Sequence, residues 1–171
     1  MHIKKLATTG VCMALCVVLP MAFHSIPNGG SIFSPMHIPV LLCGLLCGWY
    51  YGLLCGLAGP LLSSLITGMP PIGYLPPMLV ELAVYGLVAG LMMLLVRTKR
   101  NLVNVYVSLI TAMLVGRVVA GIAKALFFTQ GGYSVGIWVT AYFVTSWPGI
   151  VAHLVLIPVL VLTLKKAGLV K

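Results

Sequence analysis

Residues 35–68, PMHIPVLLCGLLCGWYYGLLCGLAGPLLSSLITG, form an unbroken apolar stretch that decides how the chain folds. One helix of that length would extend about 50 Å at about 1.5 Å per residue, whereas the hydrocarbon core of a bilayer is about 30 Å thick. Two short helices therefore fit the stretch better than one. We expect the turn between them at residues 48–52, Gly-Trp-Tyr-Tyr-Gly, because aromatic side chains are enriched at membrane interfaces.

Composition extends this conclusion to the whole chain. Of its 171 residues, 61% are hydrophobic and 6% are charged, and the mean hydropathy is +1.18. A soluble domain carries about a quarter of its residues as charged side chains, so we expect an integral membrane protein that contacts the lipid bilayer. The single acidic residue, Glu81, excludes paired-carboxylate chemistry and ATP hydrolysis by this chain. Because so little acid–base or metal machinery is present, we do not expect an enzyme.

Further apolar runs complete the pattern of an all-α membrane protein with six transmembrane helices in one domain, residues 1–171. The first run lacks a small-x-small cleavage site, so we interpret it as a retained span. The last run contains Pro148 and Pro158 and is expected to kink there. The expected spans are residues 5–22, 36–49, 53–68, 77–97, 102–128 and 136–164.

Basic residues predict the orientation. Most of them fall in three groups, which are Lys4 and Lys5, then Arg97, Lys99 and Arg100, then Lys165, Lys166 and Lys171. Six spans place all three groups on one side, which the positive-inside rule makes cytoplasmic, whereas five spans would leave the first group outside. Both termini are therefore expected in the cytoplasm. The net charge of +9 is explained by topology, so we expect no nucleic-acid partner.

Ionisable side chains at membrane depth are costly, and each is therefore a candidate site. Lys124 and Arg117 are seven residues apart near the outer end of the fifth span, and Glu81 lies in the first turns of the fourth. An outward-facing pocket with two cations and one anion suits a ligand that carries a carboxylate or a phosphate. The alternative is a structural ion pair of Glu81 with Arg117 or Lys124.

Histidines supply a second kind of candidate. His24 is expected to close the first span and His37 to open the second, both facing outward, while His153 is expected in the cytoplasmic half of the sixth. A neutral imidazole in an apolar pocket is a standard haem ligand. His37 would then be the axial ligand to the metal, with His24 as the second candidate. A hydrogen-bonded scaffold role is the alternative for His37.

Small residues recur every four positions at Gly44, Gly48, Gly52 and Gly56, a spacing that lets helix backbones approach closely. Ala7, Gly10 and Ala14 form a similar small face on the first span. That face could dock a partner subunit, and packing within the chain is the alternative.

These features together resemble the S-components of energy-coupling factor (ECF) transporters over essentially the whole chain. The stretches that carry the resemblance are the small residues Ala7, Gly10 and Ala14, then residues 34–48, 51–61 and 67–71, and Glu81-Leu-Ala-Val-Tyr-Gly-Leu-Val-Ala-Gly90. The resemblance implies a subunit in a bacterial plasma membrane that captures a micronutrient from outside. It also implies toppling of the subunit when it engages a membrane coupling subunit driven by two ATPase subunits.

The resemblance further implies where the partners bind. The coupling subunit would contact Ala7, Gly10 and Ala14, although Gly10 stands where an alanine is usual. The substrate would lie among the last three spans under the first and third outer loops, and Tyr133 belongs to the third.

The substrate itself is a separate expectation. Haem comes first, because it would use outward histidines, two cations for its propionates and an apolar, aromatic pocket; it would be cargo, since no intrinsic cofactor is expected. Pantothenate or another anionic vitamin would use Arg117 and Lys124 equally well without a histidine ligand. A neutral pyrimidine precursor would leave both cations unexplained. Outside the family, the rival is a stand-alone channel or transporter, which would need no ATPase.

Overall fold

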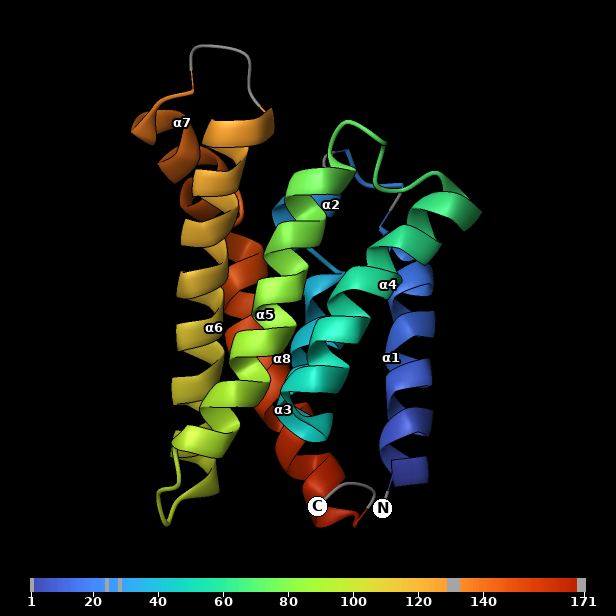
Figure 1. Ribbon diagram of the computed structural model, residues 1–171, viewed down its shortest axis with the longest axis vertical. Coiled ribbons are helices and arrows are strands. Elements are labelled where there is room, and N and C mark those ends of the chain that lie inside the picture. The colour runs from blue at the N-terminus through green and yellow to red at the C-terminus, as the bar shows by residue number, and fades with distance from the viewer. Residues whose placement is uncertain (1, 24, 28, 129–132, 169–171) are drawn as a thin grey trace.

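The computed structural model describes residues 2–23, 25–27, 29–128 and 133–168, and this part of the chain is an all-helical bundle without strands (Figure 1). The elements in chain order are α1 (His2–Ala22), α2 (Gly29–Phe33), α3 (His37–Cys47), α4 (Trp49–Thr67), α5 (Leu75–Leu95), α6 (Asn101–Ala123), the π-helical turn η1 (Lys124–Phe128), α7 (Val135–Val139), the π-helical turn η2 (Thr140–Val144) and α8 (Trp147–Lys166).

Six helical segments within the described residues are long and apolar enough to cross a membrane, which confirms the predicted class. They are Ile3–Ala22, Gly29–Cys47, Trp49–Thr67, Leu75–Leu95, Asn101–Phe127 and Trp147–Lys166. Large apolar side chains are exposed along their outer faces, as expected where lipid replaces water.

The long apolar stretch folds as two helices, as predicted, but the turn between them is a single residue. Gly48 has a φ of 101°, which a residue with a Cβ rarely adopts. Its N–H donates to the carbonyl of Gly44 at 3.0 Å, and its own carbonyl accepts from the N–H of Gly52 at 3.0 Å. The aromatic residues expected in the turn therefore form the first turn of α4.

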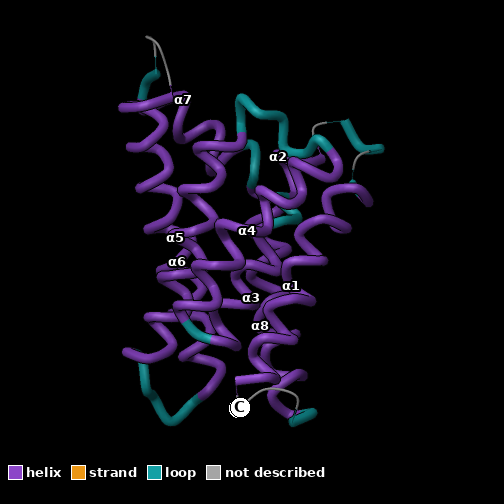
Figure 2. The backbone as a smooth tube through the Cα atoms, turned by 45° about the vertical axis from the view of Figure 1, so that its right-hand side comes forward, coloured by secondary structure: helices purple, strands orange, loops and turns teal. Residues whose placement is uncertain are grey.

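Helix α3 lies at the centre of the bundle and packs against α1, α4, α5 and α8, as Figures 1 and 2 show. The glycine spacing serves these contacts. A Cβ on Gly44 or Gly52 would lie 2.6 or 2.3 Å from the carbonyl oxygen of Gly86 on α5, and one on Gly56 would lie 2.3 Å from that of Leu82. The predicted close approach of backbones is confirmed, and α5 is the neighbouring helix.

The expected sixth span, residues 136–164, is wrong at its start. The chain instead forms α7 and η2, turns at Thr145 and Ser146, and restarts as α8 at Trp147. Pro148 explains the restart, because proline lacks a backbone N–H and suits the first turn of a helix. Pro158 does lie inside α8, as expected.

This later start also moves His153. It was expected in the cytoplasmic half of the span, but it lies in the second turn of α8, at the same end of the bundle as His37.

The first outer loop, expected as a connection between two spans, contains the short helix α2. A Cβ on Gly149 of α8 would lie 2.7 Å from the carbonyl of Ile32, so α2 packs directly on α8.

The two ends of the bundle differ. The N-terminal end of α1, the α5–α6 turn and the C-terminal end of α8 lie together at one end, at the bottom of Figure 1, which we call the terminal end. Helix α2 and the segments that join α4 to α5 and α7 to α8 lie at the opposite end. Which end faces the cytoplasm stays a prediction from the basic residues.

Candidate functional site

A cavity of about 910 Å³ opens at the end of the bundle opposite the terminal end. Its lining comes from α2, the starts of α3 and α5, the ends of α1, α4 and α6, and the segment around η2. Segments distant in sequence therefore form one concave site, and four of the residues predicted from sequence line it. They are His37, Glu81, Arg117 and Lys124.

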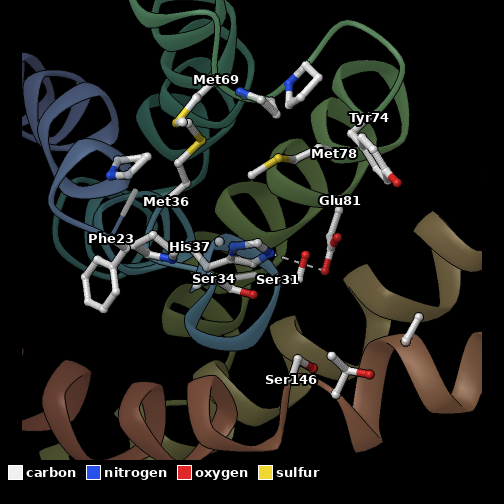
Figure 3. A pocket seen from close by; sticks show the side chains of 18 of the residues that line it. Phe23, Ser31, Ser34, Met36, His37, Met69, Tyr74, Met78, Glu81 and Ser146 are labelled. Atoms are coloured by element: carbon white, nitrogen blue, oxygen red, sulfur yellow. Dashed lines mark ion pairs between the residues drawn. The ribbon is translucent and has the colours of Figure 1, made fainter. Parts of the chain in front are cut away.

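Glu81, the only carboxylate side chain of the protein, is held from two sides. The Nε2 atom of His37, the first residue of α3, lies 3.3 Å from its Oε1 atom (Figure 3). The hydroxyl of Tyr85, one turn along α5, donates to the same oxygen at 2.9 Å. Both groups approach Oε1, and no hydrogen bond to Oε2 is found among the described residues, so that oxygen can still accept one from a ligand.

Arg117 reaches the same cluster from α6 and is only 3% exposed. Its Nε–H donates to the Tyr85 hydroxyl at 3.0 Å, and an Nη1–H donates to the backbone carbonyl of Tyr142 in η2. The ring of Phe143 lies 5.3 Å from its guanidinium carbon, and Trp138 donates its indole N–H to the Arg117 carbonyl at 3.1 Å. Arg117 thus joins α6 to the α7–η2 segment and is connected to the acid through a tyrosine.

Lys124 lies in η1, beside Tyr133. Its Nζ atom is 5.6 Å from the centre of the Tyr133 ring, within the range of a cation–π contact. Burial, followed by the negative charge of Glu81, raises the pKa of Tyr133 above its ordinary value. Tyr133, which was predicted to bind substrate, is not among the residues that line the cavity, whereas Lys124 is.

The histidines are distributed differently from the prediction. His37 and His153 stack with ring centroids 5.9 Å apart and planes 17° from parallel. His153 is fully buried, and within the described residues neither of its nitrogens nor Nδ1 of His37 has a hydrogen-bond partner. His24 lies outside the described residues. No group of three or more His, Cys, Asp or Glu residues that could hold a metal ion is found in residues 2–23, 25–27, 29–128 and 133–168.

Sequence reasoning missed several members of this site. Tyr85 had a usable signal, because it follows Glu81 by four residues and so shares its helix face. Tyr142 had none, since it contributes a backbone carbonyl from a π-helical turn. Three methionines form an apolar wall, and Figure 3 shows their side chains reaching toward the space beside His37. They are Met36, Met69 and Met78.

The small-residue face of α1 lies apart from the cavity. Ala7, Gly10 and Ala14 are all exposed, and a Cβ added to Gly10 would meet no atom within 4 Å. The opposite face of the helix, with Cys12 and Cys16, is buried. The face is therefore free in the single chain rather than used for packing within it, and docking of a coupling subunit there stays a prediction.

Comparison with known proteins supports the resemblance. The family described as "ECF transporter, substrate-specific component" matches residues 4–162, a range that includes part or all of every candidate span. No curated protein sequence and no solved structure matches the chain. A family match over most of the length, together with six membrane-spanning helices, shows that this chain belongs to the substrate-specific components of ECF transporters.

Proposed function

We propose that this chain captures an organic micronutrient that carries at least one negatively charged group, and delivers it to an ECF importer. Family membership supports the capture role, since ECF substrate-specific components bind a small molecule and act with coupling and ATPase subunits. One observation carries the choice of ligand charge. Arg117 and Lys124 both line the cavity, and Glu81 is the one carboxylate side chain there, so these three groups leave an excess positive charge that an anion would balance.

The lining also favours an amphipathic ligand. The methionine wall can adapt to an apolar or ring-shaped group, because thioether side chains are flexible and polarisable. The volume of about 910 Å³ lies near the upper end of the roughly 300–1,000 Å³ common for small-molecule sites. A vitamin-sized carboxylate fits this description, with its anion at Lys124 and a hydroxyl or N–H group donating to Glu81. Pantothenate is our first probe of this class.

Haem is the second candidate, favoured by the size of the cavity and by the methionine wall beside His37. We rank haem after a carboxylate vitamin for two reasons. The Nε2 atom of His37 faces Glu81, and its Nδ1 atom is covered by protein. Axial ligation would therefore require the imidazole ring to turn out of its contact with Glu81, whereas binding of an anion leaves the cluster intact.

Absorption spectroscopy separates the two ligand classes. The detergent-purified protein is titrated with haemin while its absorption spectrum is recorded, and in parallel it is titrated with pantothenate in a calorimeter. Both titrations are made on the wild type, His37→Ala and His24→Ala. The proposal expects saturable binding of pantothenate or another carboxylate vitamin, retained in both variants, and no saturable Soret shift. A Soret shift that one histidine variant abolishes would instead establish haem as the substrate. Binding of neutral compounds alone would overturn the proposed ligand charge.

A second test concerns the class of protein. In liposomes, the isolated chain should bind its substrate without transporting it, and uptake should require the coupling and ATPase subunits together with ATP. Transport by the chain alone would favour a stand-alone channel or transporter.

A third test concerns orientation. A reporter that folds only in the cytoplasm is fused to the C-terminal end, and it should be active if both termini lie inside the bacterial plasma membrane, as proposed.

A further inference from the structure

A dense group of positive charge lies far from the cavity, at the terminal end. Arg97, Lys99 and Arg100 occupy the turn between α5 and α6, and all three side chains are exposed. We call these three residues the basic turn. Its backbone is held by Asn104, whose Oδ1 accepts from the N–H of Thr98 at 2.9 Å and whose Nδ2 donates to the Thr98 carbonyl at 3.1 Å. The turn is thus a fixed platform from which the three side chains project.

No acidic side chain of this chain lies near the basic turn. The single one that the chain has, Glu81, lines the cavity at the opposite end, where it contacts His37. The Nε–H group of Arg97 donates a hydrogen bond to the backbone carbonyl of Leu94, at 3.1 Å. The three exposed side chains of the basic turn can therefore bind an anionic group of another molecule without competition from an acidic side chain of this chain.

The residues on either side of the turn indicate what kind of molecule this is. Leu95 is the last residue of α5 and is 75% exposed, and Leu102 is the second residue of α6 and is 47% exposed. Exposed leucines directly beside exposed cations match the two layers of a phospholipid, acyl chain and headgroup. A phospholipid would contact both kinds of side chain, whereas a water-soluble anion would contact the cations alone.

The position of the basic turn argues against its contacting a protein subunit that docks on the α1 face. Figure 1 shows the α5–α6 turn and the start of α1 on opposite sides of the terminal end. Helix α1 packs on α3 and α4, whereas α6 packs on α5 and α8. A subunit seated on Ala7, Gly10 and Ala14 would leave the basic turn in the membrane.

We infer that the basic turn binds the phosphate groups of anionic phospholipids, with their acyl chains against Leu95 and Leu102. Each basic residue close to an anionic membrane surface strengthens binding roughly fivefold. The contact would anchor the α5–α6 corner of the bundle in the headgroup layer. Any reorientation of the bundle within the bilayer would have to break it.

Native mass spectrometry tests this inference. The full chain is released from mixed micelles that contain equal parts of phosphatidylcholine and phosphatidylglycerol, and the ratio of the two bound lipids is measured. We compare the wild type with the triple variant Arg97→Gln, Lys99→Gln and Arg100→Gln, and with a charge-preserving control, Arg97→Lys, Lys99→Arg and Arg100→Lys. The wild type and the control should prefer phosphatidylglycerol, and the glutamine variant should lose that preference about tenfold or more.

Two further experiments test whether the bound phosphate belongs to a lipid or to a free anion, and whether the glutamine variant is correctly folded. Inorganic phosphate added at the concentration of the lipid should not displace phosphatidylglycerol; displacement would show a site for a free anion and overturn the lipid assignment. Circular dichroism in phosphatidylcholine vesicles should show equal helicity for all three proteins. If the glutamine variant keeps its lipid preference but loses co-purification with the coupling subunit, the basic turn is a protein-docking site and the inference is wrong.

Discussion

Glu81 of α5 and Arg117 of α6 are joined through one hydroxyl group, that of Tyr85, which accepts from the Arg117 Nε–H at 3.0 Å and donates to Glu81 Oε1 at 2.9 Å. A direct ion pair between Glu81 and Arg117 would also join α5 to α6, but it would occupy the carboxylate with the guanidinium. The tyrosine instead connects them while Glu81 keeps an oxygen that can still accept a hydrogen bond. The arrangement combines support for the helices with a site at which a ligand can bind.

Tyr85→Phe should destabilise the protein. The change removes the hydroxyl and leaves the buried Arg117 Nε without its acceptor, and a buried unsatisfied donor costs about 1–3 kcal/mol, more if it is charged. Thermal unfolding in detergent should shift down by several degrees. The matched control is Tyr50→Phe, since Tyr50 is 55% exposed and should show no shift. Equal melting temperatures for the two variants would contradict the role assigned to the Tyr85 hydroxyl.

Lys124→Gln should weaken binding of an anionic ligand by about tenfold or more, because hydrogen bonds to charged groups contribute about 1.5–3 kcal/mol. Lys124→Arg keeps the charge and should retain most of the affinity. Calorimetric titration with the carboxylate vitamin that binds the wild type is the measurement. Unchanged affinity in the glutamine variant would show that the anion lies elsewhere in the cavity.

Gly86→Ala should disrupt the packing of α4 on α5. The added Cβ would lie 2.1 Å from the carbonyl oxygen of Gly52, so the helices must separate, and overpacking of this kind costs about 1–3 kcal/mol. Gly10→Ala is the control, because no atom lies within 4 Å of its added Cβ. Melting temperatures should fall for the first variant and stay constant or rise slightly for the second, because alanine is a better helix former than glycine. The opposite order would mean that the α4–α5 contact is looser than described.

Gly10→Leu should abolish ATP-driven uptake and leave ligand affinity nearly unchanged. The side chain would project from the exposed small-residue face of α1, where the coupling subunit is proposed to dock, and would prevent close approach of another helix. Ile66→Phe, at a site that is 69% exposed on α4, controls for added bulk facing lipid and should transport normally. If Gly10→Leu also lost ligand affinity, α1 would be coupled to the cavity rather than reserved for docking.

Much of the fold could be predicted because its signals are local in sequence. Hydropathy and helix rise required a break within residues 35–68, and Gly48 lies at that break. Spacing along single helices placed Glu81, Arg117 and Lys124 at one end of the bundle. The shared small face of Ala7, Gly10 and Ala14 followed from the same periodicity, whereas its exposure was established by the structure.

The tertiary structure decided which of those side chains meet. The stacking of His37 on His153 depends on where α8 starts, and that start was hidden inside an apolar run because residues 135–144 are as apolar as a span. The bond from Arg117 to the Tyr142 carbonyl depends on a π-helical turn, for which residue spacing gives no signal. Sequence by itself determined the membrane-spanning class, most of the spanning segments and the charges at each end, since these depend on the length and polarity of single segments. Only the packing of distant segments could bring His37, Glu81, Tyr85 and Arg117 into one cluster, because contacts between helices depend on their angles and separations rather than on the pattern within any one of them.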